Sequence, residues 1–369
     1  MEKMITLSSL SAEELGVTNP KITCQSDLRF YSVKQEPFTI YGLYDPLGGS
    51  PYHRMPESVA EAVNDGVKLN NFCTAGGRVR FVTDSDYIAL RMISGGSAHM
   101  SNMCLNASSA FDIYVSRNGT DRFAGVFDPP LTGYTDGYDD IIGPPWLPKG
   151  RKEVTINFPL YSGVTGLWIG LDRNSGIEKR AGYRIGKPIL YYGSSITQGG
   201  CASRPGMAYE AIISRRLDAD FINLGFNGSA RAEQPIADYL ASLDPVVFVM
   251  DYDYNAPDPE YLAKTHENLY RTFRAAHPDT PVIMVGKPDF WLCNESNMER
   301  RDVIYRTYNN ARLRGEKVIF IDGHSLFPAN MREECTVDNC HPNDLGFYRM
   351  AACIEPVVKH ILETRETLI

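Results

Sequence analysis

Two stretches that lie far apart in the chain carry residue types that together could perform acyl transfer. The first, residues 193–197 (GSSIT), follows a short apolar run at 188–192 that predicts a buried strand. The second runs from Asp338 to His341 and precedes the apolar stripe of a predicted last helix. A serine nucleophile, a histidine base and an aspartate that orients the base are the groups that this chemistry needs. Ser195 by itself leaves a second interpretation open, in which the serines only cap a helix.

The spacing of Asp338 and His341 favours a catalytic arrangement. Pro342 disfavours helical backbone at His341, so the imidazole should project from an extended residue just before a helix starts. A turn over three residues can then fold the Asp338 carboxylate back onto one ring nitrogen and leave the other for Ser195. An isolated histidine in this place would more simply cap the helix or pack against it.

Five apolar segments, each separated from the next by a helical pattern, predict a parallel sheet covered by helices on both faces. They are residues 188–192, 221–224, 246–250, 281–285 and 318–321. In such a sheet the loops after the strands meet at one edge, where ligands bind. The loops bring Ser195, the glycine-containing segment 225–230 and the segment 251–256 to the same edge as His341.

The first half of the chain has a different pattern. Short alternating or apolar runs are separated by Gly, Asn and Asp turns, at 79–82, 87–93, 111–115, 154–158 and 167–171. Such a series is typical of an all-β sandwich or jelly roll. Residues 172–187 are polar and predict a linker. We therefore expect two domains, an all-β domain over residues 1–178 and an α/β/α domain over residues 186–369.

Aromatic and acidic residues in the first half indicate a sugar partner. Asp136, Tyr138 and Trp146 lie in a turn-rich stretch, and sugars are bound by stacking on aromatic rings and by carboxylates that accept hydroxyl hydrogen bonds. Trp291 follows the fourth predicted strand and should lie at the catalytic edge. An ordinary surface loop and simple packing of both tryptophans are the alternatives.

Composition restricts the possible partners and cofactors. The net charge is −8 and no long basic run is present, so we expect no nucleic-acid or membrane partner. No apolar run approaches the roughly 18 residues that a spanning helix needs, and the start lacks the apolar core of a secretory signal. Eight cysteines without CxxC pairs favour reduced thiols and a cytoplasmic location, with an exported form as the alternative. No His/Cys cluster has metal-ligand spacing, so we expect no metal and no other cofactor.

Four blocks of the second half, taken in order, resemble the motifs of SGNH (GDSL-type) hydrolases. They are Gly193-Ser194-Ser195-Ile196, the glycine of Asn227-Gly228, the asparagine of Tyr254-Asn255, and Asp338 with His341. The resemblance implies a three-layer, flavodoxin-like α/β/α fold and a Ser195–His341–Asp338 triad. It also implies an oxyanion hole made of the Ser195 and Gly228 backbone N–H groups and the Asn255 amide. Ser194 stands where the family name has aspartate.

The whole layout, a β domain followed by this hydrolase, is similar to carbohydrate esterase family 17, which removes acetyl groups from mannan-derived oligosaccharides. Residues 199–209 and 341–346 carry this narrower resemblance. It implies a serine acetylesterase acting on acetylated oligosaccharides, with a carbohydrate-binding-like β domain. A lipase or thioesterase for other acyl groups, and an inert carbohydrate-binding protein, are the alternatives. The sequence does not indicate an oligomeric state.

Overall fold

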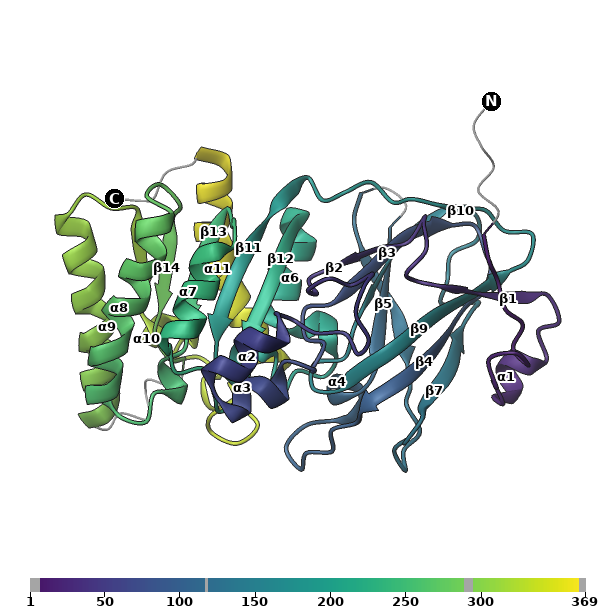
Figure 1. Cartoon of the computed structure of the whole chain (residues 1–369), viewed down its shortest axis with the longest axis horizontal. Coiled ribbons are helices and arrows are strands. Elements are labelled where there is room, and N and C mark those ends of the chain that lie inside the picture. Colours follow the sequence, from purple (N-terminus) through teal and green to yellow (C-terminus); the bar gives the residue numbers. More distant parts are fainter. Residues whose placement is uncertain (1–6, 117–118, 289–294, 365–369) are drawn as a thin grey trace. The chain divides into compact units, whose positions relative to one another are not determined.

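The computed structural model describes residues 7–116, 119–288 and 295–364, and the chain divides into two compact units (Figure 1). Each unit is made of three separate segments of the sequence. The first unit comprises Met1–His53, Phe72–Gly182 and Arg204–Gly206, and the second comprises Arg54–Asn71, Tyr183–Ser203 and Met207–Ile369. The main break therefore falls in the predicted linker. The segment Arg54–Asn71, by contrast, belongs with the second unit although it lies well inside the predicted β domain.

The first unit is strand-rich and contains two antiparallel sheets. One has the order β1 (Leu28–Ser32), β9 (Gly163–Asp172), β4 (Ile88–Gly96), β7 (Gly137–Ile142). The other has the order β10 (Ile177–Glu178), β3 (Arg78–Thr83), β8 (Lys152–Asn157), β5 (Phe111–Ser116), β6 (Arg122–Phe127), with β2 (Thr39–Tyr41) also paired to β3. Side chains of both sheets, among them Leu90 and Ile113, share one apolar core. The predicted sandwich is thus the observed architecture, with short helices α1 (Pro20–Thr23) and α4 (Leu105–Ser108) added.

The interpretation of Tyr138 as a sugar-binding loop residue was wrong. Tyr138 lies in strand β7, is only 3% exposed, and belongs to the core between the two sheets. Its hydroxyl donates to the backbone carbonyls of Phe127 and Ser109, at 3.1 and 3.3 Å. Tyr138, Asp140 and Ile142 are buried in alternation, a period-2 pattern that predicts a strand and that the neighbouring turn residues hid.

The second unit contains the five-stranded parallel sheet that the sequence predicted. Its order is β12 (Ala219–Gly225), β11 (Ile185–Gly193), β13 (Val247–Asp251), β14 (Val282–Val285), β15 (Val318–Ile321). Neighbouring strands of the sheet are paired in parallel. Gly193, at the end of β11, lies opposite Gly225 of β12 and Asp251 of β13. Because all five strands point the same way, their carboxyl ends form one edge of the sheet.

Helices cover both faces of this sheet, as Figure 1 shows. The helices of the second half are α5 (Ser195–Gln198), α6 (Tyr209–Leu217), α7 (Gln234–Ser242), α8 (Pro259–Ala276), α9 (Glu295–Leu313), α10 (Gly323–Leu326) and α11 (Asp344–Thr364). Helices α7, α8 and α9 pack in sequence on one face, and α6 packs with α11 on the other. Leu190 faces the first group, whereas Tyr191 contacts the ring of Tyr209 in α6. Within the described residues, no helix is both long and apolar enough for a membrane span.

Segment Arg54–Asn71 adds two short helices to the first of these faces. They are α2 (Glu57–Val63) and α3 (Asp65–Asn70), and α2 packs against α7. The Asn64 amide donates to the Ser229 carbonyl and to Glu233, at 3.1 and 2.8 Å. These contacts attach a segment from the first half of the chain to the loop after β12.

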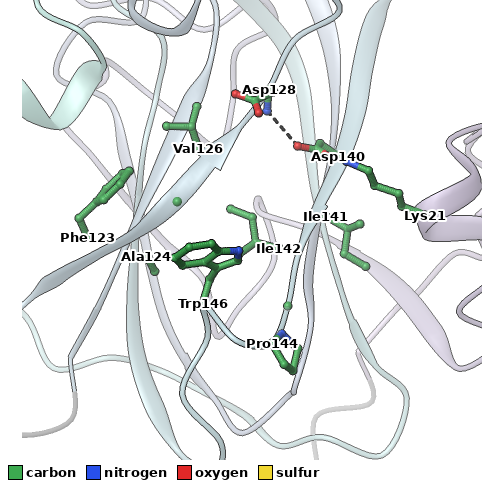
Figure 2. A pocket seen from close by; sticks show the side chains of 12 residues that line it. Lys21, Phe123, Ala124, Val126, Asp128, Asp140, Ile141, Ile142, Pro144 and Trp146 are labelled. Carbon is green, nitrogen blue, oxygen red and sulfur yellow. Dashed lines mark hydrogen bonds and ion pairs between the residues drawn. The ribbon is translucent and has the colours of Figure 1, made fainter.

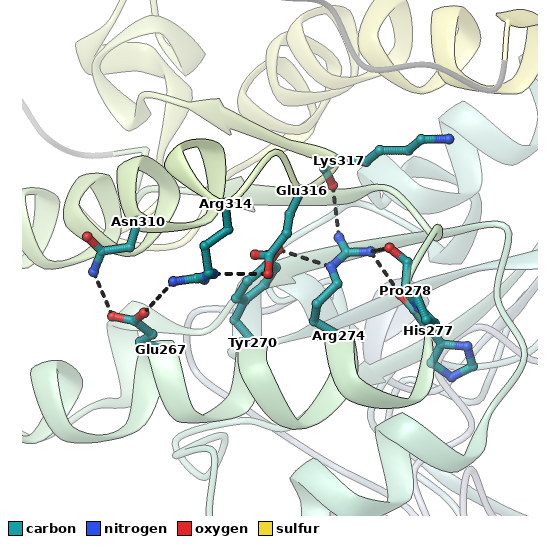
Figure 3. A network of polar contacts seen from close by, with 9 residues as sticks. All are labelled: Glu267, Tyr270, Arg274, His277, Pro278, Asn310, Arg314, Glu316 and Lys317. Atoms are coloured by element: carbon teal, nitrogen blue, oxygen red, sulfur yellow. Dashed lines mark hydrogen bonds and ion pairs between the residues drawn. The ribbon is translucent and has the colours of Figure 1, made fainter.

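A buried polar network aligns the starts of β14 and β15 (Figure 3). Arg274 of α8 is 7% exposed, and its guanidinium donates to the carbonyls of His277, Pro278 and Thr280, just before β14, each at 2.8 Å. The same group donates to the carbonyl of Lys317, just before β15, at 2.9 Å. One rigid, planar donor group therefore satisfies backbone acceptors from two adjacent strand entrances.

Candidate active site

The candidate nucleophile lies where β11 turns into helix α5. Ser194 is the N-cap of this helix and its hydroxyl accepts from the Ile196 N–H at 3.1 Å, while Ser195 is the first helical residue. The two interpretations of the serine pair thus apply to different residues, since Ser194 caps and Ser195 has another partner. A Cβ on Gly193 would lie 2.2 Å from the Asp251 carbonyl oxygen, so the strand must carry glycine there for the turn to pack against β13.

Ser195, His341 and Asp338 form a continuous hydrogen-bonded chain. The Ser195 hydroxyl lies 2.9 Å from Nε2 of His341, and Nδ1 of His341 lies 2.9 and 3.2 Å from the two carboxylate oxygens of Asp338. With Asp338 accepting from Nδ1–H, Nε2 of a neutral imidazole carries the lone pair that can take the Ser195 proton. Ser195 is 8% exposed and the His341 side chain is 22% exposed. A substrate can therefore reach these hydrogen-bonded side chains from solvent.

The loop before α11 holds His341 in this position. Asp338 also accepts from the backbone N–H groups of Cys340 and His341, at 3.2 and 2.8 Å, which closes the predicted three-residue turn. Asn339 has a φ of 64°, in the left-handed region that asparagine tolerates better than most residues. The Val337 N–H donates to the His341 carbonyl at 2.9 Å. Hydrogen bonds of the turn at residues 337–341 therefore hold the imidazole in position, in addition to the following helix α11.

Gly228 and Asn255 lie on the loops that flank Ser195 on either side. β11 is paired in parallel with both β12 and β13, so the loop with Gly228 and the short helix η2 (Asp253–Asn255) follow its two neighbours. Gly228 has a φ of 67°, and a Cβ there would meet open space. The Asn255 amide donates to the Phe226 carbonyl at 2.9 Å. An amide nitrogen has two hydrogens, so Asn255 can hold that loop and still donate to a substrate oxygen.

Two buried arginines hold these flanking loops in place, and neither was predicted from the sequence. Arg54 is 2% exposed; its guanidinium donates to the carbonyls of Gly225 and Asn70 and lies 4.5 Å from the centre of the Phe226 ring. Arg300 of α9 is 8% exposed and donates to the carbonyls of Asp253 and Ala256, which enclose Asn255. The loops bearing Gly228 and Asn255 are therefore fixed through their backbone oxygens by charged donors, which give stronger hydrogen bonds than neutral ones. No local motif marks either arginine.

A buried carboxyl group at the end of β13 contacts the helix that begins with Ser195. Asp251 is 1% exposed and accepts from the hydroxyls of Thr197 and Tyr209, at 3.1 and 3.2 Å. Burial raises the pKa of Asp251 well above its ordinary value, and the nearby carboxyl of Asp253 raises it further. Asp251 is therefore protonated over a wider pH range than an exposed aspartate, and adds less negative charge next to helix α5.

The structure describes three of the four predicted substrate-binding residues. Trp291 lies outside the described residues. Asp136 is exposed, and Tyr138 is in the core as described above. Trp146 is 72% exposed and lines a pocket of about 530 Å³ in the first unit, together with Phe123, Asp128 and Asp140 (Figure 2).

A cysteine also lies beside the triad. Three atoms that could bind a metal lie within 4.8 Å of one another: Sγ of Cys201, a carboxylate oxygen of Asp338 and a ring nitrogen of His341. The sequence predicted no metal-ligand cluster because Cys201 is far from the other two in the chain. Only the sheet topology, which joins the loops after β11 and before α11, brings a thiol, an imidazole and a carboxylate together.

Comparison with family models assigns both halves of the chain. Residues 186–359 match the GDSL-like lipase/acylhydrolase family, and residues 28–177 match the N-terminus of SGNH-hydrolase-type esterases. The second half of the chain belongs to the GDSL-like lipase/acylhydrolase family. Its fold and its Ser195–His341–Asp338 geometry fit a carboxylic ester hydrolase of this family. No curated protein sequence matches the chain.

Solved structures extend the likeness over both units. A candidate GDSL-like lipase from Bacteroides ovatus is 28% identical, covers 92% of this chain and 100% of its own, and has a TM-score of 0.82. The salicylyl-acyltransferase SsfX3 of a tetracycline biosynthetic pathway is 19% identical, with 92% and 99% covered and a TM-score of 0.74. An acetyl xylan esterase from Butyrivibrio proteoclasticus is 14% identical, with 92% and 99% covered and a TM-score of 0.57. The last two show a shared fold.

Replacing Asp338 by asparagine tests the orientation of the acylhydrolase histidine. An amide can donate to Nδ1 and so favour the tautomer whose Nε2 carries the proton, which cannot accept from Ser195. We expect Asp338→Asn to lower kcat for p-nitrophenyl acetate by about 10³–10⁴-fold, measured by stopped-flow and steady-state assays. Glu333→Gln, an equal change of charge on an exposed residue of the same loop, should change kcat little. Similar kcat values for the two variants would show that Asp338 does not orient the base.

Proposed function

We propose that this chain is a serine acetylesterase that removes O-acetyl groups from oligosaccharides of the plant-mannan type. The observation that carries the proposal is the hydrogen-bonded chain from Ser195 through His341 to Asp338. A hydroxyl 2.9 Å from an oriented imidazole is the arrangement that activates serine toward an acyl carbonyl. The family assignment supports ester hydrolysis, and the specificity for acetylated sugars is our inference.

The reaction proceeds through an acetyl-enzyme. Nε2 of His341 takes the proton of Ser195 as its oxygen attacks the acetyl carbonyl, and Asp338 stabilises the imidazolium that forms. The oxyanion receives hydrogen bonds from the Ser195 and Gly228 backbone N–H groups and from the Asn255 amide, each with an effect of about 3 kcal/mol on the barrier. The sugar hydroxyl leaves with the proton from His341. Water then attacks the acetyl-enzyme by the same route and releases acetate.

The pocket of the first unit supports a sugar partner. Trp146 presents an exposed ring to it, and Phe123 is 47% exposed, with its ring 4.0 Å from the Arg204 guanidinium. Asp128 and Asp140 lie across the pocket from Trp146 in Figure 2. A flat aromatic ring and nearby carboxylates are the two kinds of group that hold a pyranose, through stacking and through hydroxyl hydrogen bonds. The volume, about 530 Å³, is within the range of small-molecule sites.

Replacing Ser195 by alanine tests the acetyl-enzyme. We expect Ser195→Ala to abolish the burst of p-nitrophenol from p-nitrophenyl acetate and to lower kcat by at least about 10³-fold. Ser194→Ala is the matched control, because it removes a neighbouring hydroxyl that caps α5; it should cost about 1 kcal/mol of stability and retain the burst. A burst that survives in Ser195→Ala would end the proposal. With the wild type, faster hydrolysis of longer acyl esters than of acetate would instead indicate a lipase or thioesterase.

Replacing Trp146 by alanine tests the sugar pocket. The experiment uses the Ser195→Ala background, so that an acetylated manno-oligosaccharide binds without turnover. Loss of ring stacking should weaken binding by about 1 kcal/mol, or roughly fivefold in Kd, measured by isothermal titration calorimetry. Leu131→Ala, which alters an exposed side chain that does not line the pocket, should leave Kd unchanged. Equal Kd values for both variants would exclude the pocket as a sugar site without affecting the catalytic proposal.

A further inference from the structure

Cys201 lies beside the catalytic histidine in a backbone conformation that suits glycine better. It follows Gly199 and Gly200, and its φ of 74° is in the left-handed region, where a non-glycine residue is strained by about 1–2 kcal/mol. Cys201 is 8% exposed. A third glycine at this position would relieve the strain, so the thiol is held beside His341 at an energetic cost.

Direct contacts fix the Cys201 loop to the segment that carries His341. The N–H and hydroxyl of Ser203 donate to the two carboxylate oxygens of Asp344, at 2.7 and 2.6 Å. Asp344 is the first residue of α11, only a few positions after His341. On the other side of Cys201, the Gly200 N–H donates to the Ser195 carbonyl at 2.8 Å. The loop is thus anchored at both ends, to the nucleophile helix and to the base-bearing segment.

We propose that Cys201, Asp338 and His341 form an inhibitory zinc site. Their ligating atoms lie within 4.8 Å of one another, and a tetrahedral Zn²⁺ with ligand distances of 2.0–2.3 Å needs separations of about 3.5 Å, so side-chain movements of about 1 Å complete the site. A thiolate, an imidazole and a carboxylate are the ligand types that zinc takes, with water in the fourth position. The partial exposure of Asp338 and His341 gives the ion access from solvent.

Binding at this site stops proton transfer whichever ring nitrogen coordinates the ion. The Cys201 thiol loses its proton to solvent as the Zn–S bond forms, and one imidazole nitrogen gives its lone pair to zinc. Coordination through Nε2 removes the acceptor of the Ser195 proton. Coordination through Nδ1 moves the ring proton to Nε2, so it removes both the hydrogen bond to Asp338 and the lone pair that would accept the Ser195 proton. Zinc is therefore an inhibitor here and not a cofactor.

Cobalt spectroscopy tests binding without any ester hydrolysis. In Ser195→Ala protein, stoichiometric Co²⁺ should produce a thiolate-to-cobalt charge-transfer band and the visible spectrum of a tetrahedral site. The band should be lost in Ser195→Ala/Cys201→Ala and retained in Ser195→Ala/Cys340→Ala, which removes the cysteine next to His341 in sequence. Absence of the band, or an unchanged band without Cys201, would overturn the proposal.

Inhibition of ester hydrolysis gives the second readout, which rests on the proposed function. Zinc chloride should inhibit p-nitrophenyl acetate hydrolysis, EDTA should restore it, and inhibition should become stronger as pH rises because the thiol must lose its proton. Relative to its own uninhibited rate, Cys201→Ala should require at least about tenfold more zinc. Equal zinc inhibition of both proteins would contradict the site. A protein that shows the cobalt band yet hydrolyses no ester would instead contradict the proposed function alone.

Discussion

The hydrogen bond between Nδ1 of His341 and the Asp338 carboxylate is the contact on which the site depends. A neutral imidazole has one donor and one acceptor nitrogen, and this bond, 2.9 Å long, assigns the acceptor to the side of Ser195. The Asp338 carboxylate also accepts hydrogen bonds from the backbone N–H groups of Cys340 and His341. The same carboxylate therefore orients the imidazole and stabilises the turn that carries it. The acid and the base are parts of a single turn, and their geometry needs no third segment.

The remainder of the second unit brings that turn to a serine and keeps the surrounding loops rigid. Strand β11 lies between β12 and β13, so Ser195 lies between the loops with Gly228 and Asn255. Arg54 and Arg300 hold those loops by their carbonyl groups, and Asp344 ties the Cys201 loop to α11. Preorganised donors of this kind do not have to reorient as charge develops on a substrate oxygen. Residues that are far from Ser195 and His341 in sequence therefore contribute to the site by holding its loops in position.

Much of this arrangement is predictable from sequence, because short-range patterns encode it. The five apolar segments became the five parallel strands, and the spacing of Asp338, His341 and Pro342 gave the turn. Features that depend on pairing between distant segments were not predictable. Tyr138 was misplaced because turn residues beside β7 hid its alternation, and Arg54 was missed because nothing local shows that α2 and α3 pack on the second unit. The proximity of Cys201 to His341 arises only from the tertiary structure, because the two residues are far apart in the sequence.

Labelling with a fluorophosphonate tests directly whether His341 activates Ser195, since this reagent phosphonylates a serine that a base activates. We expect an intact-mass increase of one phosphonyl group, located at Ser195 by peptide mapping. We also expect labelling to be at least about 10²-fold slower in His341→Ala, because that variant lacks the positioned general base. Labelling at another serine, or an equal rate without His341, would contradict activation of Ser195 by His341.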